Sequence, residues 1–262
     1  MFIEERHHKI MEILKRTERV EVTELCKLFD VSEDTIRRDL RILEEKNKVK
    51  RTYGGAILPE KVSVALPMLR RDDLQTYEKN EIAILAASFI NDNDTILLDG
   101  STTVSKIIPL LTIRKNLTVI TNSVQIAHDI IVLESNFETS IKLYMIGGLV
   151  QKNIANTVSI ESLMTIKNLS VDKVFLGVCA ISPRYGLTTP SLEEAQIKKA
   201  MIESAREVYL LADSSKFGVR SLALIDELKP EYTIISDSDF SPDIKNEFKD
   251  WISKGLQIIT PI

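Results

Sequence analysis

Residues 31–56 read VSEDTIRRDLRILEEKNKVKRTYGGA, and this stretch decides the fold of the N-terminal part of the chain. Ser32 is a strong helix N-cap residue, and the acidic pair that follows it suits the positive end of a helix dipole. The segment predicts a helix over residues 32–46 with one apolar side and one arginine-rich side. The apolar side consists of Ile36, Leu40 and Leu43, and the arginines that lie largely off it are Arg37, Arg38 and Arg41.

Three further segments precede this helix. Residues 4–17 place apolar side chains at helical spacing, and residues 19–22 (RVEV) predict a short extended entry. Thr23 predicts the N-cap of a short helix over residues 23–30, and Val31 predicts a turn. A short helix, a tight turn and a longer helix that opens with small polar residues are the layout of a helix-turn-helix.

Basic residues are concentrated immediately after the long helix. Residues 46–59 contain no acid, alternate roughly between basic and apolar side chains, and are punctuated by Gly54-Gly55. This pattern predicts a two-stranded wing with a tight turn. The chain has a net charge of −4, but residues 1–58 carry +1 and the remainder carries −5. The charge distribution therefore favours a DNA-contacting surface at the N-terminus despite the acidic total.

The second helix of a helix-turn-helix enters the major groove, where an arginine can donate two hydrogen bonds to a guanine edge. Basic residues of the wing neutralise phosphates, which sets affinity without reading sequence. A small helical domain whose arginines only form a solvated face is the alternative, and the acid-free wing argues against it. The predicted partner is double-stranded operator DNA, and the predicted DNA-binding residues are Ser32, Glu33, Thr35, Arg37, Arg38, Arg41, Lys48, Lys50 and Arg51.

These residues carry a family resemblance. The stretch over residues 31–56 resembles the N-terminal signature of the DeoR-type repressors, in which a V-S-x-x-T-I-R-R-D-L-x-x-L run is followed by a basic wing that ends in G-G-A. The resemblance implies that Thr35, Arg37 and Arg38 lie in or beside the DNA groove. It also implies a structural role for Asp39, which we expect to orient a neighbouring arginine.

The pattern changes at about residue 79, after a segment over residues 59–78 with two prolines and no strong period. From there, apolar strand-like runs alternate with helical segments, which predicts an α/β fold with a doubly wound, mostly parallel sheet. We therefore predict a winged helix-turn-helix over residues 1–58, a linker over 59–78 and an α/β effector-sensing domain over 79–262. The predicted helices cover 78–91, 102–112, 123–133, 158–168, 191–205 and 242–253, and the predicted strands cover 94–99, 117–121, 141–146, 172–178, 207–212, 232–236 and 256–259.

Polar loops follow several of these strands. Open α/β sheets bind ligands at the carboxyl ends of their strands, and hydroxyls with free backbone N–H groups suit a phosphate. Capping of the next helix explains any one loop equally well, but several such loops at one sheet edge favour a phosphorylated polar ligand. The loop residues are Asp99, Gly100, Ser101, Thr102, Thr103, Thr121, Asn122, Gly147, Gly148, Asp213 and Lys216.

The DeoR resemblance extends over nearly the whole chain, through EKNEIA, LLDGSTT, VITNS, IGG, VFLGV, EEAQIKKAM and LLADSSKFG. It implies a sensor domain that resembles ribose-5-phosphate isomerase and binds a phosphorylated sugar or related metabolite. Ser101 departs from the family loop, where glycine is common. The effector contacts or transmitters that the resemblance implies are Lys79, Asp99, Thr102, Thr103, Asn122, Lys198, Asp213 and Lys216.

Two other functions compete with a metabolite-controlled repressor of a carbohydrate operon. A phosphosugar isomerase needs a carboxylate base, but the acidic run of the isomerases is replaced by Leu176–Ala180 (LGVCA) in this chain. Glu193 and Glu194 lie nearby at a predicted helix start, where capping is the simpler explanation. We therefore expect no enzyme activity and no catalytic residue. A purely architectural DNA-binding protein would respond to no ligand.

Composition restricts the remaining possibilities. Cys26 and Cys179 lie in apolar patterns, which predicts buried free thiols in a reducing cytoplasm, and the few histidines and cysteines predict no metal site and no cofactor. We expect His7, His8 and His128 each to have a surface or partly packed role. No apolar run reaches the length of a membrane span, and the charged N-terminus predicts no signal peptide. A homodimer or homotetramer is expected, because paired half-sites raise the specificity of a small winged helix.

Overall fold

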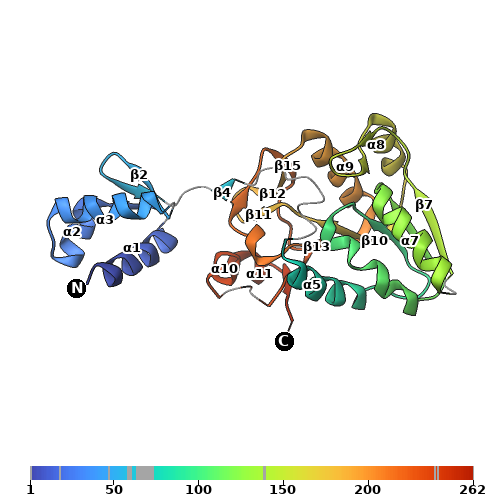
Figure 1. The fold of residues 1–262 in the computed structure, drawn as a ribbon, viewed down its shortest axis with the longest axis horizontal. Helices are drawn as coiled ribbons and strands as arrows, with labels where there is room; N and C mark the ends of the chain where they lie inside the picture. The colour runs from blue at the N-terminus through green and yellow to red at the C-terminus, as the bar shows by residue number, and fades with distance from the viewer. Residues whose placement is uncertain are drawn as a thin grey trace. The chain divides into compact units, whose positions relative to one another are not determined.

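The structure is a computed structural model that describes residues 2–17, 19–46, 48–57, 61–62, 74–137, 140–238, 240 and 242–261. The chain forms two compact units, Met1–Lys61 and Val62–Ile262 (Figure 1). Most of the predicted linker lies outside the described residues. Its last three residues are helical, because helix α5 covers Thr76–Ser88.

The N-terminal unit is a helical layer with a small sheet. Strand β3 lies between β1 and β2 and is antiparallel to both, so the predicted two-stranded wing has β1 as a third strand. A core of buried side chains from all three helices and the sheet includes Leu14, Val20, Leu25 and Leu40. The elements are α1 (Ile3–Thr17), β1 (Arg19–Glu21), α2 (Val22–Phe29), α3 (Glu33–Glu45), β2 (Lys50–Thr52) and β3 (Gly55–Ile57).

The start of α2 differs from the prediction. Thr23 is not its N-cap, because the helix begins at Val22, and the capping residue Glu21 makes no side-chain hydrogen bond to it. The backbone N–H of Val22 instead donates to the carbonyl oxygen of Gly54, at 2.8 Å. The wing turn thus satisfies an N–H group that a side-chain cap would otherwise have to satisfy, and the N-cap lies two residues earlier than predicted.

The C-terminal unit is built on a parallel seven-stranded sheet with the order β17-β16-β13-β10-β5-β6-β7. The strands are continuous apolar runs, and neighbours pair in parallel throughout. This is the predicted doubly wound α/β architecture. The strands are β5 (Thr95–Leu98), β6 (Leu117–Thr121), β7 (Ile141–Met145), β10 (Val171–Gly177), β13 (Ala205–Leu211), β16 (Thr233–Ile235) and β17 (Gln257–Ile259).

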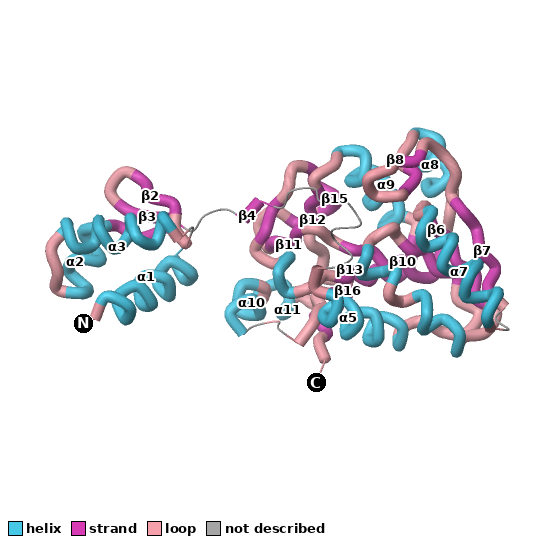
Figure 2. Tube along the Cα trace, in the orientation of Figure 1, coloured by secondary structure: helices cyan, strands magenta, loops and turns pink. Residues whose placement is uncertain are grey.

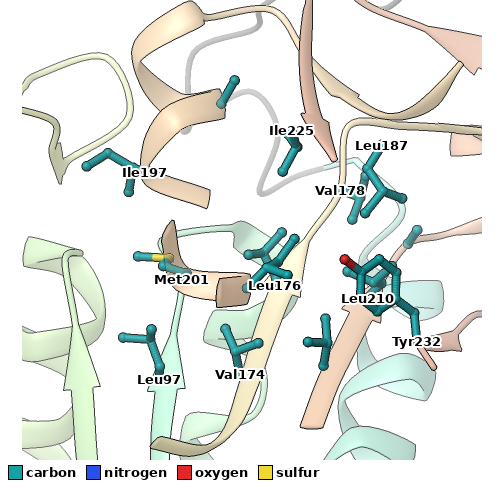
Figure 3. Close-up of a cluster of buried hydrophobic side chains, with 14 of the residues drawn as sticks. Leu97, Val174, Leu176, Val178, Leu187, Ile197, Met201, Leu210, Ile225 and Tyr232 are labelled. Atoms are coloured by element: carbon teal, nitrogen blue, oxygen red, sulfur yellow. The ribbon is translucent and has the colours of Figure 1, made fainter. Parts of the chain in front are cut away.

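Helices cover both faces of this sheet (Figure 2). Alternate residues of each strand belong to different hydrophobic clusters: Leu97 of β5 packs on one face, and Ile96 and Leu98 pack on the other. Figure 3 shows the cluster that contains Leu97, in which Ile197 and Met201 of helix α9 lie over the strand residues. The helices are α5, α7 (Val124–Asn136), α8 (Ile160–Lys167), α9 (Leu192–Glu203), α10 (Pro242–Glu247) and α11 (Lys249–Ser253), with the single turn α6 (Thr102–Ser105) and the 3-10 segments η1 (Ile108–Ile113) and η2 (Ser214–Lys216).

Two predicted helices are each divided in the structure. The helix predicted over 102–112 is the short α6 followed by η1, and Pro109 stands at the start of η1, where it lacks the N–H that a continuous helix needs. The helix predicted over 242–253 is interrupted at the fully buried Phe248, which separates α10 from α11.

Several short strands were not predicted. β11, β12 and β15 form a separate antiparallel sheet, and β14 pairs with β4 and β8 with β9. They escaped prediction because strands of two to four residues are too short to show a period. Their bounds are β4 (Lys61–Val62), β8 (Val150–Gln151), β9 (Asn156–Thr157), β11 (Ala180–Ser182), β12 (Gly186–Thr189), β14 (Val219–Arg220) and β15 (Ala223–Asp226).

The strand order contains one topological switch point. The chain enters the sheet at β5, runs outward through β6 to β7, and then returns to the other side of β5 as β10. The chain after β5 therefore leads to helices on one face of the sheet and the chain after β10 to helices on the other, and the two loops lie side by side at the carboxyl ends of these strands. Open α/β sheets bind ligands in the crevice at such a point.

Candidate functional site

Helix α3 presents its predicted polar side to solvent. Its N-cap Ser32 accepts a hydrogen bond from the backbone N–H of Thr35, as predicted. Ile36, Leu40 and Leu43 are buried, and Arg37 forms an exposed ion pair with Glu33 at 3.1 Å. The predicted arginines thus surround the exposed face near the start of the helix, which is the part of a helix-turn-helix that meets base edges.

Asp39 connects α3 to α1. Arg6 donates to both carboxylate oxygens of Asp39, from Nε at 2.5 Å and from Nη2 at 3.1 Å, and both residues are buried. The structural role expected of Asp39 is confirmed, and its partner is an arginine of another helix. His7 also lies 3.1 Å from Asp39, with only 14% of its side chain exposed, so it has the partly packed role that was one of the two expected. These contacts of Arg6 and His7 with Asp39 hold the recognition helix α3 against helix α1.

The wing extends the exposed basic surface. Lys50 and Arg51 lie on β2, and Glu44 of α3 accepts a hydrogen bond from the backbone N–H of Arg51 at 2.9 Å. Tyr53, which was not predicted, is fully exposed at the wing turn. An aromatic ring beside a run of basic residues is the signal that could have indicated it. Of the predicted DNA-binding residues, Thr35 is half-buried, and the exposed ones are Ser32, Glu33, Arg37, Arg38, Arg41, Lys48, Lys50 and Arg51.

The C-terminal unit has a pocket of about 180 Å³ at the switch point of its sheet. The loops after β5, β10 and β13 line it, together with the first residues of α9 and of the segment that leads into α5. The loops after β5 and β10 are in close contact, since a Cβ added to Gly177 would lie 2.1 Å from Oγ of Ser101. The predicted residues in its lining are Lys79, Gly100, Ser101, Thr102, Thr103, Lys198, Asp213 and Lys216.

A buried ion pair lies at the base of this pocket. Nζ of Lys198 donates to Oδ2 of Asp99 and to the carbonyl oxygen of Gly177, the latter at 2.7 Å. The other carboxylate oxygen of Asp99 accepts the backbone N–H groups of Ser101 and Gly177, each at 3.1 Å. Burial lowers the pKa of Lys198, but the Asp99 carboxylate, together with the nearby Cys179 and Glu194, outweighs burial and leaves the pKa raised. Lys198 is therefore a charged side chain whose charge is neutralised within the protein.

The loop after β13 supplies a second ion pair. Asp213 is buried and caps η2 by accepting the backbone N–H of Ser215. Nζ of Lys216 lies 3.4 Å from Asp213, and its side chain is 36% exposed, so it is accessible from solvent. This wall of the pocket combines a buried carboxylate with a more exposed lysine.

The remaining predicted effector residues lie elsewhere. Asp99 and Asn122 line a small hollow that shares four residues with the main pocket, among them Lys198. Thr121, Gly147 and Gly148 line neither space: Oγ1 of Thr121 donates to the carbonyl oxygen of Leu98, and Gly147 accepts a hydrogen bond from Ser162.

Prediction missed several pocket residues. Glu194 lines the pocket in addition to starting α9, although sequence reasoning favoured a capping role. Cys179 is half-buried in the lining, and both cysteines are free thiols with intermediate exposure rather than fully buried ones. Gln75, Gln151, Asn153, Asn156 and Ser191 complete the polar lining. They come from short strands and turns whose positions depend on the tertiary fold.

The described residues contain no group of acids, histidines and cysteines that could hold a metal ion. Within the same residues, every helix is too short or too polar to cross a bilayer.

Comparison with known proteins supplies the family. Residues 6–62 match the DeoR-like helix-turn-helix domain, and residues 74–238 match the DeoR C terminal sensor domain. The HTH-type transcriptional repressor GlcR of Bacillus subtilis (strain 168) is 37% identical over 237 residues, which cover 90% of this chain and 89% of that protein. The glycerol-3-phosphate regulon repressor of Escherichia coli (strain K12) is 31% identical over 234 residues, with 89% and 90% covered.

Among solved structures, ribose 5-phosphate isomerase A from Methanocaldococcus jannaschii is 19% identical, with a TM-score of 0.38 over 53% of each chain. The two domain matches and the curated relatives agree with the exposed helix-turn-helix and with the α/β unit behind it. This chain belongs to the DeoR family of DNA-binding transcriptional regulators.

Proposed function

We propose that the protein is a cytoplasmic repressor of a carbohydrate-catabolic operon, and that a phosphorylated sugar bound in the switch-point pocket releases it from its operator. The observation that carries this proposal is a pocket that combines three lysines with clustered hydroxyl and amide groups at the carboxyl ends of parallel strands. Lysines and hydroxyls bind phosphate, and amides bind sugar hydroxyls. The names of two relatives, a glycerol-3-phosphate regulon repressor among them, support the same class of function.

The size of the pocket fits this ligand class. An apolar cavity of about 150 Å³ accommodates benzene, so a polar one of about 180 Å³ has room for a small phosphorylated sugar. Because the side chain of Lys216 is 36% exposed whereas Lys198 is buried against Asp99, we assign the phosphate to the Lys216 side of the pocket, with Lys79 and the hydroxyl of Thr103 in the same lining. The sugar hydroxyls would then meet Asn153, Asn156 and Glu194.

Transmission to the DNA-binding unit is proposed through the start of the C-terminal unit. Leu74 and Gln75 line the pocket and directly precede α5. Gln75 has a left-handed backbone conformation, with φ of 53°, which is uncommon for a residue with a side chain. A ligand that contacts Gln75 therefore acts on the chain segment that comes from the helix-turn-helix. Such coupling is typically about 1–3 kcal/mol, or about 5- to 150-fold in operator affinity.

The effector prediction is tested by a mobility-shift titration on upstream DNA with a panel of sugar phosphates. We expect one compound to weaken operator binding. Thr103→Val should raise the effector concentration needed for release by about 10-fold or more, because a hydrogen bond to a charged phosphate contributes about 1.5–3 kcal/mol. Operator affinity without effector should be unchanged. The control is Thr165→Val on the exposed face of α8, and equal effects of the two variants would contradict the assignment.

The DNA-binding prediction separates base contacts from phosphate contacts. Arg37→Ala should cost about 1–3 kcal/mol on the specific operator and relax sequence preference, because an arginine that reads a guanine is lost. Lys50→Ala should weaken binding to all DNA about equally and reduce the salt dependence. Titrations on operator and unrelated DNA at two salt concentrations measure both effects. Identical behaviour of the two variants would show that the division between them is wrong.

Isomerase activity is the competing function for the pocket, since Glu194 is a carboxylate in its lining. We propose that the protein turns over no sugar phosphate. Asp99 and Asp213 are each held by a lysine, and the family consists of transcriptional regulators. A measurable isomerase rate that Glu194→Gln abolishes would overturn this part of the proposal. A purely architectural role would instead show no thermal stabilisation by any sugar phosphate.

A further inference from the structure

Strand β7 forms an open edge of the parallel sheet. It pairs with β6 over five residues without a shift in register, and no strand among the described residues pairs with its other side. The backbone N–H of Ile146 donates across to Thr121, at 2.8 Å. Because backbone groups alternate in direction along a strand, Lys142 and Tyr144 also point theirs toward β6. Leu143 and Met145 therefore direct their N–H and C=O groups outward.

This edge has few of the features that protect most edge strands: Oε1 of Glu134 accepts the outward N–H of Ile141 at 3.2 Å, and this hydrogen bond would be exchanged on pairing. The opposite edge, β17, has three residues and is followed by Pro261. By contrast, β7 has five residues, no proline or bulge, and one charged residue, Lys142. Tyr144 and Met145 are 47% and 41% exposed. A regular, exposed and apolar edge is a template for pairing with another strand.

We propose that β7 pairs antiparallel with β7 of a second copy of this chain and joins the two sheets across a two-fold axis. An isologous contact requires a self-complementary surface, so the strand itself must fit its own copy. Outward-pointing residues form the hydrogen-bonded pairs of an antiparallel ladder. The register that uses all five residues centres on Leu143, with Ile141 facing Met145 of the partner subunit. One face of the junction is then apolar on both sides.

Charge selects the same register. With Leu143 at the centre, Lys142 faces Tyr144 of the partner subunit, and the ammonium group meets an aromatic ring. The two side chains already share a face within one strand, where Nζ of Lys142 lies 5.1 Å from the ring centre of Tyr144. Cation–π contacts of this kind are favourable. A shift by one pair in one direction places Lys142 against Lys142 of the partner subunit, which like-charge repulsion disfavours. A shift in either direction also leaves only three of the five residues paired.

The surface around the strand supports a larger contact. Exposed apolar side chains flank β7 along the chain on both sides: Phe137 is 57% exposed, and Leu149 and Val150 are 73% and 43% exposed. None of these residues, nor any residue of β7, lines the effector pocket. The contact is therefore independent of the proposed effector, and a failure of one proposal leaves the other standing.

The test is the oligomeric state of the full chain, measured by light scattering and sedimentation velocity at micromolar concentration. We expect the wild-type particle to have at least twice the chain mass of 29.6 kDa. Tyr144→Lys should halve the particle, because each copy then opposes Lys142 with a second lysine. The double variant Lys142→Glu with Tyr144→Lys should restore the wild-type size, since glutamate then faces lysine in the same register.

A matched control and a backbone variant complete the test. Ile113→Lys also places a lysine at an exposed aliphatic position, which is 70% exposed, and it should leave the particle unchanged. Met145→Pro removes an outward N–H and should halve the particle without loss of the folded monomer, because proline is tolerated at strand edges. A monomeric wild type, an unchanged size for Tyr144→Lys, or a double variant that stays dissociated would each overturn the proposal. Circular dichroism establishes that each variant is folded.

Discussion

Replacement of Lys198 by methionine is expected to lower the free energy of unfolding of the C-terminal unit by about 3–5 kcal/mol at neutral pH. The variant leaves the Asp99 carboxylate buried without its cation, and Asp99 is only 2% exposed. Two backbone N–H groups still bind Asp99, but they do not neutralise its charge. Urea unfolding followed by circular dichroism measures the loss.

The dependence of this effect on pH has a definite sign. The pKa of Lys198 is raised in the folded protein, so the pair stabilises it fully below the ordinary lysine value of 10.5 and the stabilisation is lost only as pH rises through the raised pKa. The control is Arg206→Met, which removes the 81% exposed partner of Asp172 and should cost less than about 1 kcal/mol. Equal losses in the two variants would show that burial of the Lys198 pair is unimportant.

Replacement of Asp39 by alanine is expected to abolish operator binding by unfolding the N-terminal unit. The variant removes the buried carboxylate that accepts two hydrogen bonds from Arg6, and the loss of this ion pair should cost about 3–5 kcal/mol. A unit of this size has a total stability of only about 3–9 kcal/mol. In most molecules of the variant, the recognition helix α3 would then lose its fixed position against α1. Mobility shift measures DNA binding, and circular dichroism measures the lost helix.

Asp34→Ala is the matched control for this prediction. Asp34 lies in the same helix but is exposed in its first turn, so its removal should cost no more than about 1 kcal/mol. The thermal transition of the C-terminal unit should be unchanged in both variants, because the two units have separate hydrophobic cores. Operator binding by Asp39→Ala at wild-type affinity would show that the Arg6–Asp39 pair does not hold the recognition helix.

The N-terminal unit was predictable because its signals are local. The cap at Ser32, the apolar spacing of Ile36, Leu40 and Leu43, and the basic run of the wing all act within a few residues of one another. Thr23 is the exception. It was predicted to cap α2, but the carbonyl oxygen of Gly54 in the wing turn, distant in sequence, accepts the backbone N–H of Val22 at the start of the helix. Similarly, Asp39 was recognisable as structural, whereas its partner Arg6 was not.

The effector pocket was predictable only in part. Strand ends in a parallel sheet meet at one edge by topology, so the loop residues from Gly100 to Thr103, with Asp213 and Lys216, converge as expected. Gly147 and Gly148 also follow a strand, but β7 is the last strand on its side of the sheet, away from the switch point. Gln151, Asn153 and Asn156 reach the pocket from short strands that carry no readable period.

The sequence by itself determined a winged helix-turn-helix, an α/β unit and the side chains that make up the recognition helix. These follow from periodicity, capping and charge, which operate between near neighbours in the chain. Only the tertiary structure decided that Lys198 is neutralised by Asp99, that Glu194 lines the pocket, and that β7 is an open edge. The reason is physical: ion pairing, pocket shape and strand order depend on contacts between residues distant in sequence, which no local pattern specifies.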